Sequence, residues 1–118
     1  MQALLLLGAL LLQSGSGTGT GHGLTGTWSF RGSCPATHVR SRGRLTVTGQ
    51  GPIYRFAWTD GVTELPGQGL RVGNYLSVRF GDDESGGLMH MRRWRGGWRG
   101  TWAYYGQRLR CTERWWRR

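Results

Sequence analysis

The sequence predicts an all-β fold, an antiparallel meander of about eight strands that forms a closed or nearly closed small barrel. Three observations lead to this prediction. Apolar and polar residues alternate in short runs, turn signals interrupt the chain about every 6 to 12 residues, and no segment keeps helical spacing for a dozen residues. A meander leaves two open sheet edges unless its first and last strands meet, so closure is the favoured arrangement.

The expected strands follow one another with only turns or loops between them. The clearest is residues 52–59, where Tyr54, Phe56 and Trp58 share one face. The expected strands comprise residues 24–30, 44–48, 52–59, 62–65, 68–72, 75–80, 88–94, 98–105 and 108–116. Turns are expected at Gly49–Gly51, Asp60-Gly61, Pro66-Gly67, Gly73-Asn74 and Gly96-Gly97, and polar loops at residues 33–43 and 81–87.

The first residues resemble a secretory signal peptide. Ala3 to Leu12 form an apolar run that is too short to span a bilayer and is followed by small polar residues. We therefore expect residues 1–20 to be a signal peptide, with a Gly/Ser/Thr linker to about residue 23 and a barrel-like domain over residues 24–113. The protein would be exported, either periplasmic or secreted; a retained, uncleaved anchor is the alternative.

The only two cysteines are Cys34 and Cys111. An even count in an exported chain favours a disulfide, which would close a loop of nearly the whole domain. There is no Cys-x-x-Cys and no histidine pair, so the sequence predicts neither redox chemistry nor a zinc site, and no cofactor is expected.

A short pattern occurs at both ends of the predicted domain. Gly-x-x-Gly-Thr-Trp appears at residues 23–28 and again at residues 97–102, and a cysteine follows each copy. The two strands could lie near each other, held together by the disulfide. Chance is the alternative, because glycine, threonine and tryptophan are frequent in this chain.

The first strand, "LTGTWSF", resembles the opening strand of the avidin family, and its Gly-Thr-Trp is similar to the opening of lipocalins. Both families are up-and-down barrels that hold small ligands. Of the avidins' ligand-binding positions, Ser33 alone could correspond. The lipocalin likeness implies that an arginine from near the last strand packs across Trp28, and Arg108 or Arg110 could do so. Residues 51–58, 67–78 and 96–102 also resemble a type of small exported bacterial domain of unknown role.

A barrel of this kind predicts a small apolar pocket, although at this size the side chains alone can fill it. The residues expected to line the pocket or the core are Trp28, Tyr54, Phe56, Trp58, Leu76, Val78 and Trp102.

The sequence contains no evident catalytic constellation. His38 lies in a predicted loop, and His90 alternates with two methionines, which places it on the opposite face of its strand. Asp82 to Glu84 are consecutive in one loop, and not across a cleft as paired acid–base catalysis requires. We therefore expect a non-catalytic binding or structural module of the cell envelope.

The positive charge is concentrated near the C-terminus. All 16 basic residues are arginine, and nine of them lie in residues 92–118 against one acidic residue, Glu113. An alternative function is therefore contact with anionic envelope lipid or polysaccharide; nucleic acid is not expected outside the cell. The candidate contacts are Arg99, Arg108, Arg110, Arg114, Trp115, Trp116, Arg117 and Arg118.

Strand geometry gives these residues a second interpretation. Over residues 97–112 the pattern also fits a final hairpin with a charged outer face, in which Trp98, Trp102, Leu109 and Cys111 point inward. Residues 114–118 are expected to be a cationic aromatic tail. Its alternatives are that the two tryptophans fold back to cap the barrel, or that the tail has no role.

Overall fold

Period-two alternation is clearest in the strand that contains Leu76, Val78 and Phe80. These three side chains are buried, while Tyr75 and Arg79 between and beside them are exposed. One side of such a strand faces the core and the other faces solvent. The computed structural model describes residues 23–117, and it repeats this pattern around a closed sheet.

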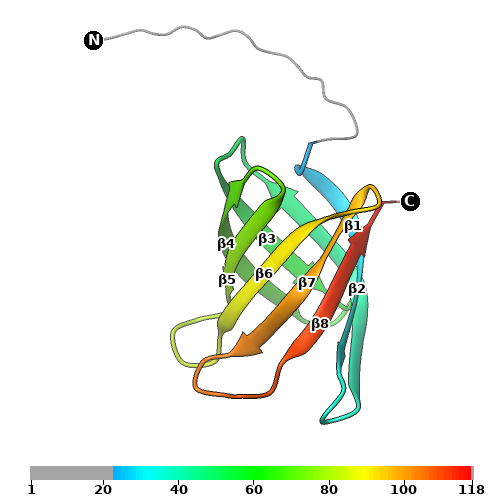
Figure 1. Cartoon of the computed structure of the whole chain (residues 1–118), viewed down its shortest axis with the longest axis vertical. Coiled ribbons are helices and arrows are strands. Elements are labelled where there is room, and N and C mark those ends of the chain that lie inside the picture. Colours follow the sequence, from blue (N-terminus) through cyan, green and yellow to red (C-terminus); the bar gives the residue numbers. More distant parts are fainter. Residues whose placement is uncertain (1–22, 118) are drawn as a thin grey trace, which may run out of the picture.

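Eight antiparallel strands form the barrel in the order of the chain (Figure 1). They are β1 (Gly26–Cys34), β2 (Val39–Thr48), β3 (Ile53–Thr59), β4 (Glu64–Val72), β5 (Tyr75–Phe80), β6 (Gly87–Trp94), β7 (Gly97–Tyr104) and β8 (Cys111–Trp116). β1 pairs with β2 on one side and with β8 on the other, which closes the sheet. The predicted all-β meander of about eight strands and its closure are confirmed.

The two ends of the barrel differ. At one end lie the loops at residues 35–38, 60–63, 81–86 and 105–110, and we call it the disulfide end because Cys34 and Cys111 are bonded there. At the other, the terminal end, the chain enters at Gly23 and leaves at Arg117. Figure 1 shows the disulfide end at the bottom, and the start of β1 and the end of β8 at the top.

The predicted disulfide between Cys34 and Cys111 is present and links positions 77 residues apart. It joins the end of β1 to the start of β8, the two strands whose pairing closes the barrel. The two Gly-Thr-Trp strands, β1 and β7, are not direct neighbours, because β8 lies between them and pairs with both.

The interior is one apolar cluster dominated by aromatic rings. Its buried members are Leu24, Trp28, Phe30, Leu45, Val47, Phe56, Trp58, Leu76, Val78, Phe80, Met89, Met91, Trp98 and Trp115, with Tyr54 and Trp102 packed against them. Half of the buried members are aromatic, and each aromatic side chain buries a large apolar area, so aromatic packing contributes much of the stability of this small barrel.

Three local predictions were wrong. Pro66-Gly67 is not a turn but lies within β4, where Pro66 pairs with Ala57. The predicted polar loop over residues 33–43 is mainly the hairpin of β1 and β2; its polar character reflects exposure beyond the core. The last strand begins at Cys111, so Leu109 lies in a loop and is exposed, and it does not point into the core.

The predicted signal peptide and nearly all of its linker lie outside the described residues, as does Arg118. Within residues 23–117, no helix has the length and apolar character needed to cross a membrane.

Candidate functional site

Tryptophan and arginine seal the terminal end of the barrel. Trp28 and Trp98 are almost completely buried there, and the Arg117 guanidinium lies 4.0 Å from the Trp28 ring centroid. Arg117 also donates hydrogen bonds to the backbone carbonyls of Gly23 and Thr25, which fasten the entering chain to the leaving chain. An arginine does pack across Trp28, as the lipocalin likeness implies, but it is Arg117 and not Arg108 or Arg110.

Among residues 23–117, Glu113 is the one ionisable side chain buried inside the barrel. It is 7% exposed and points inward from β8, between Cys111 and Trp115. Both Trp58 and Trp115 donate an indole hydrogen bond to its Oε2 atom, at 2.9 Å and 2.7 Å. Within residues 23–117, no hydrogen bond reaches the other oxygen, Oε1.

The environment of Glu113 raises the pKa of its carboxyl. Burial raises the pKa of its carboxyl from 4.5 to about 7, although the bonds from Trp115 and Trp58 lower it in part. The carboxyl therefore changes charge near neutral pH, whereas an exposed glutamate stays ionised there.

A cavity of about 390 Å³ opens at the disulfide end beside Glu113. Aromatic and apolar side chains form most of its wall, and they include Phe30, Trp58, Phe80, Met89, Trp102 and Tyr104. The ring of Trp102 lies edge-on to Phe80 and to Tyr104, with centroid distances of 5.5 Å and 5.2 Å. Its Nε1 atom is buried and has no hydrogen-bond partner among residues 23–117.

One glycine makes room for the cavity wall. A Cβ atom at Gly67 would lie 2.7 Å from Cζ3 of Trp58, closer than such atoms approach. Gly67 on β4 therefore allows the Trp58 indole to cross the barrel and reach Glu113 on the far side.

The mouth of the cavity is acidic. All six acidic residues of the chain lie at the disulfide end or, in the case of Glu113, point into the cavity there. Asp60 and Glu64 line the mouth. The Asp60 carboxylate accepts hydrogen bonds from the backbone of Thr63 and Val62, which lower its pKa and keep it charged.

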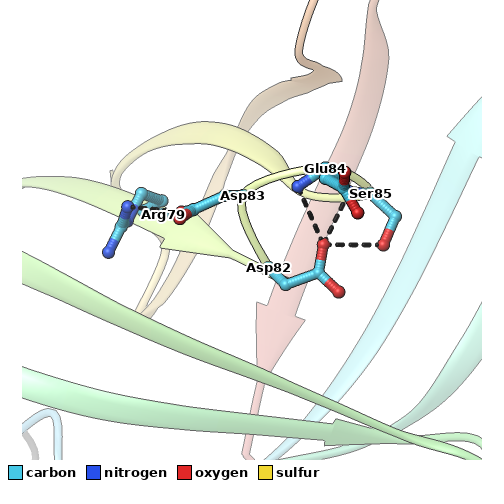
Figure 2. Close-up of polar contacts among 5 residues, drawn as sticks. All are labelled: Arg79, Asp82, Asp83, Glu84 and Ser85. Atoms are coloured by element: carbon cyan, nitrogen blue, oxygen red, sulfur yellow. Dashed lines mark hydrogen bonds and ion pairs between the residues drawn. The ribbon is translucent and has the colours of Figure 1, made fainter.

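The neighbouring loop of Asp82 to Glu84 is held by its own contacts. Figure 2 shows Asp82 accepting from the backbone N–H groups of Glu84 and Ser85 and from the Ser85 hydroxyl. The bonds from Ser85 lower the pKa of Asp82 more than the other contacts do. Asp83 points away toward Arg79, 3.3 Å from it. The loop is therefore an acidic surface element that lies apart from the cavity wall.

The predicted pocket residues divide between core and cavity. Trp58 and Trp102 line the cavity. Trp28, Phe56, Leu76 and Val78 are core, and Tyr54 packs against that core from its edge. Glu113 was not among the predicted site residues, although its alternation with Cys111 and Trp115 was a signal that it points inward.

The predicted anionic-surface residues do not form one tail. β8 continues to Trp116, and Trp115 is 1% exposed inside the barrel, so the expectation of a tail from residue 114 is corrected in favour of strand and core packing. Arg99 and Arg114 are exposed on the outer wall, and Trp116 is half-buried there. The remaining predicted contacts separate: Arg108 and Arg110 lie in the loop before β8, Arg117 covers Trp28, and Arg118 is not described.

The outer wall and the cavity offer binding groups and few reactive ones. Both cysteines are in the disulfide, and His38 and His90 are exposed away from the cavity wall. Within residues 23–117, no group of three histidine, cysteine or acidic side chains could hold a metal ion.

Comparisons of this chain with protein-family models, with the curated proteins and with the solved structures find no match.

Proposed function

We propose that this protein is an exported, non-catalytic binding protein that holds a small molecule in the cavity at the disulfide end. The observation that carries the proposal is the buried Glu113 carboxyl at the side of an aromatic cavity, whose Oε1 atom has no donor among the residues that the structure describes. A buried carboxylate costs folding free energy unless it is paired, so a residue that served only to fill the barrel would be apolar. Small-ligand sites commonly combine an apolar wall with a few polar groups.

The lining indicates the chemistry of the ligand. Aromatic rings favour a flat or apolar body, and the free oxygen of Glu113 favours a protonated amine or another N–H donor. Asp60 and Glu64 at the mouth would attract a cation and repel an anion. The proposed ligand is therefore a small aromatic or apolar molecule with a basic group.

The absence of catalysis is part of the proposal. A hydrolase of this size would need a nucleophile and a base in contact. Both cysteines are bonded to each other, and neither described histidine, His38 or His90, lines the cavity. Export is supported by the disulfide, because such bonds persist in oxidising compartments.

Three compounds of nearly equal shape test the proposal: phenethylamine, 2-phenylethanol and phenylacetate. We expect calorimetric titration at pH 8 to show binding in the order amine, alcohol, acid, with the amine at least about tenfold tighter than the alcohol. Glu113→Gln should abolish the preference for the amine, while Asp83→Asn, which removes a charge away from the cavity, should retain it. Equal affinity for all three compounds, or no binding of any of them, would overturn the proposal.

A further inference from the structure

Five exposed arginines form one continuous row across the outside of the barrel. In the strand register Arg92 lies opposite Arg99, Arg99 opposite Arg114, Arg114 opposite Arg31, and Arg31 opposite Arg42. The arginine row therefore crosses β6, β7, β8, β1 and β2, which lie side by side around the barrel. Adjacent strands lie about 4.8 Å apart, so the row is roughly 19 Å long.

This arrangement is unfavourable for the isolated protein. Like charges directly opposite each other on neighbouring strands destabilise a sheet. Within residues 23–117 the arginine row has no carboxylate in ion-pair distance, because the one pair found there joins Arg79 to Asp83. A general excess of arginine in the chain explains the residue type, but it does not explain five arginines in register. An anionic partner would remove the repulsion.

Two tryptophans hold the middle of the arginine row. The Trp94 ring lies 4.5 Å from the Arg99 guanidinium and 5.9 Å from that of Arg114. The Trp116 ring lies 5.2 Å from Arg114 and 6.0 Å from Arg31. Contact with an indole ring restricts the conformations of an arginine side chain. The N–H groups at the edge of the guanidinium remain free to form a bidentate contact with a carboxylate or sulfate.

A row of hydroxyl groups runs beside the arginines. Thr101 lies opposite Thr112, and Thr112 lies opposite Ser33, one step along the same outer face. His90 extends this row on β6, opposite Thr101. A shallow groove of about 780 Å³ is lined by the hydroxyl row and by every arginine of the row except Arg42. It therefore offers anion-binding groups on one side and neutral hydrogen-bonding groups on the other.

The shape of the wall selects the kind of partner. On an eight-stranded barrel with the usual strand tilt, the outward directions at Arg92 and Arg42 differ by roughly 100°. A flat membrane can therefore touch only part of the arginine row, whereas a flexible chain can follow all of it. Proteins that bind single-stranded nucleic acid do so largely by stacking its bases on free aromatic side chains. Here Trp94 and Trp116 are already in contact with guanidinium groups.

We infer that the arginine row, with the hydroxyl row beside it, is a binding site for a linear acidic polysaccharide. The arginines would bind its carboxylate or sulfate groups, and Ser33, Thr101 and Thr112 would bind its hydroxyl groups. This site is on the outer wall and is independent of the cavity at Glu113, so either proposal can fail without the other.

The test uses the protein without its predicted signal peptide and fluorescent oligomers of polygalacturonate and of heparin, measured by anisotropy at several salt concentrations. The row variant Arg99→Gln/Arg114→Gln is compared with the control Arg55→Gln/Arg79→Gln, which loses the same charge from β3 and β5. We expect the row variant to bind about tenfold more weakly or worse, and the control to stay within about twofold of the parent. The dependence of log affinity on log salt should also become shallower by roughly two for the row variant.

Circular dichroism checks that each variant is folded, and Arg31→Gln/Arg92→Gln provides a second row variant if the first is not. Neutral dextran, single-stranded DNA and vesicles of phosphatidylglycerol and phosphatidylcholine serve as competing partners. Equal losses in the row variants and the control would show that only net charge matters and would overturn the site. Tighter binding of DNA or vesicles than of either polysaccharide, or no binding of either polysaccharide, would overturn the identification of the partner.

Discussion

The indole Nε1 atom of Trp58 donates a 2.9 Å hydrogen bond to the carboxyl of Glu113, a residue 55 positions later in the chain. The bond crosses the barrel interior from β3 to β8, and Trp115 donates to the same oxygen from the side. Two aromatic donors thus hold one carboxyl in a fixed direction. Both bonds go to Oε2 and leave Oε1 unused, and Glu113 lines the cavity.

The stability of the protein should fall as the pH rises from about 4.5 to 7. The Glu113 carboxyl loses its proton near pH 4.5 when unfolded but near pH 7 when folded. Between these values the unfolded state binds fewer protons, so rising pH favours unfolding. Each pKa unit corresponds to about 1.4 kcal/mol, which gives a loss of roughly 3 kcal/mol in the free energy of unfolding. Urea denaturation at pH 4.5, 6 and 8 measures it.

Glu113→Gln is the control for this pH effect. Its amide oxygen can still accept from Trp58 and Trp115, but it does not ionise. We expect its stability to be nearly flat from pH 4.5 to 8 and to exceed that of the parent at pH 8. Glu64→Gln, at the exposed mouth, should keep the slope of the parent. A parent protein with no loss of stability over this range would contradict the assignment of Glu113 as a buried acid.

Arg117→Ala should loosen the terminal end of the barrel. The substitution removes the contact over the Trp28 ring and the hydrogen bonds to the carbonyls of Gly23 and Thr25. We expect a loss of about 2 kcal/mol in the free energy of unfolding. Hydrogen exchange should accelerate at the amides of β1 near Trp28. Arg108→Ala, in the exposed loop before β8, is the matched loss of charge and should change stability by less than about 0.5 kcal/mol.

Removing the disulfide should destabilise the whole barrel. Replacing Cys34 and Cys111 by serine frees a loop closed over 77 positions. The chain-entropy model assigns such a loop roughly 4 kcal/mol. The pair is replaced together, so that no free thiol remains, and the urea midpoint is compared with that of the oxidised parent. An unchanged midpoint would show that the pairing of β1 with β8 keeps the barrel closed without any stabilisation from the disulfide.

The sequence was sufficient for the fold because the relevant signals are local. The alternation of Leu76, Val78 and Phe80 lies within one strand, and two cysteines have only one possible pairing within the chain. The prediction of a turn at Pro66-Gly67 was wrong because the pair, although typical of turns, continues a strand here, in which Gly67 leaves room for the Trp58 ring.

The two proposed binding sites could not be predicted from the sequence for a different reason. The arginine row exists only in the register between strands that are distant in sequence, such as Arg31 opposite Arg114. Composition placed the charge near the C-terminus, but it could not show that Arg31 and Arg42 belong to the same row. The role of Glu113 likewise depends on Trp58, and the contact between them follows from how the barrel closes.

Gly67→Ala should change both the packing around Trp58 and the pKa of Glu113. The new methyl group would lie 2.7 Å from Cζ3 of Trp58, so the indole must move. We expect a loss of about 1–3 kcal/mol in stability. The displaced indole would weaken its bond to Glu113, and because that bond lowers the pKa of the carboxyl, the pKa should rise above about 7.

Gly69→Ala is the matched control for this clash. Its methyl group would meet the Ser77 carbonyl oxygen at 2.7 Å and Val78 at 2.8 Å, on the same strand but without touching Trp58. Both variants should therefore be destabilised, while only Gly67→Ala should shift the titration of Glu113, followed by carbon-13 NMR of its carboxyl. Equal titration in both variants would mean that the Trp58 bond does not control the ionisation of Glu113. The pKa of about 7 would then be set by burial, which raises it, and by the bond from Trp115, which lowers it.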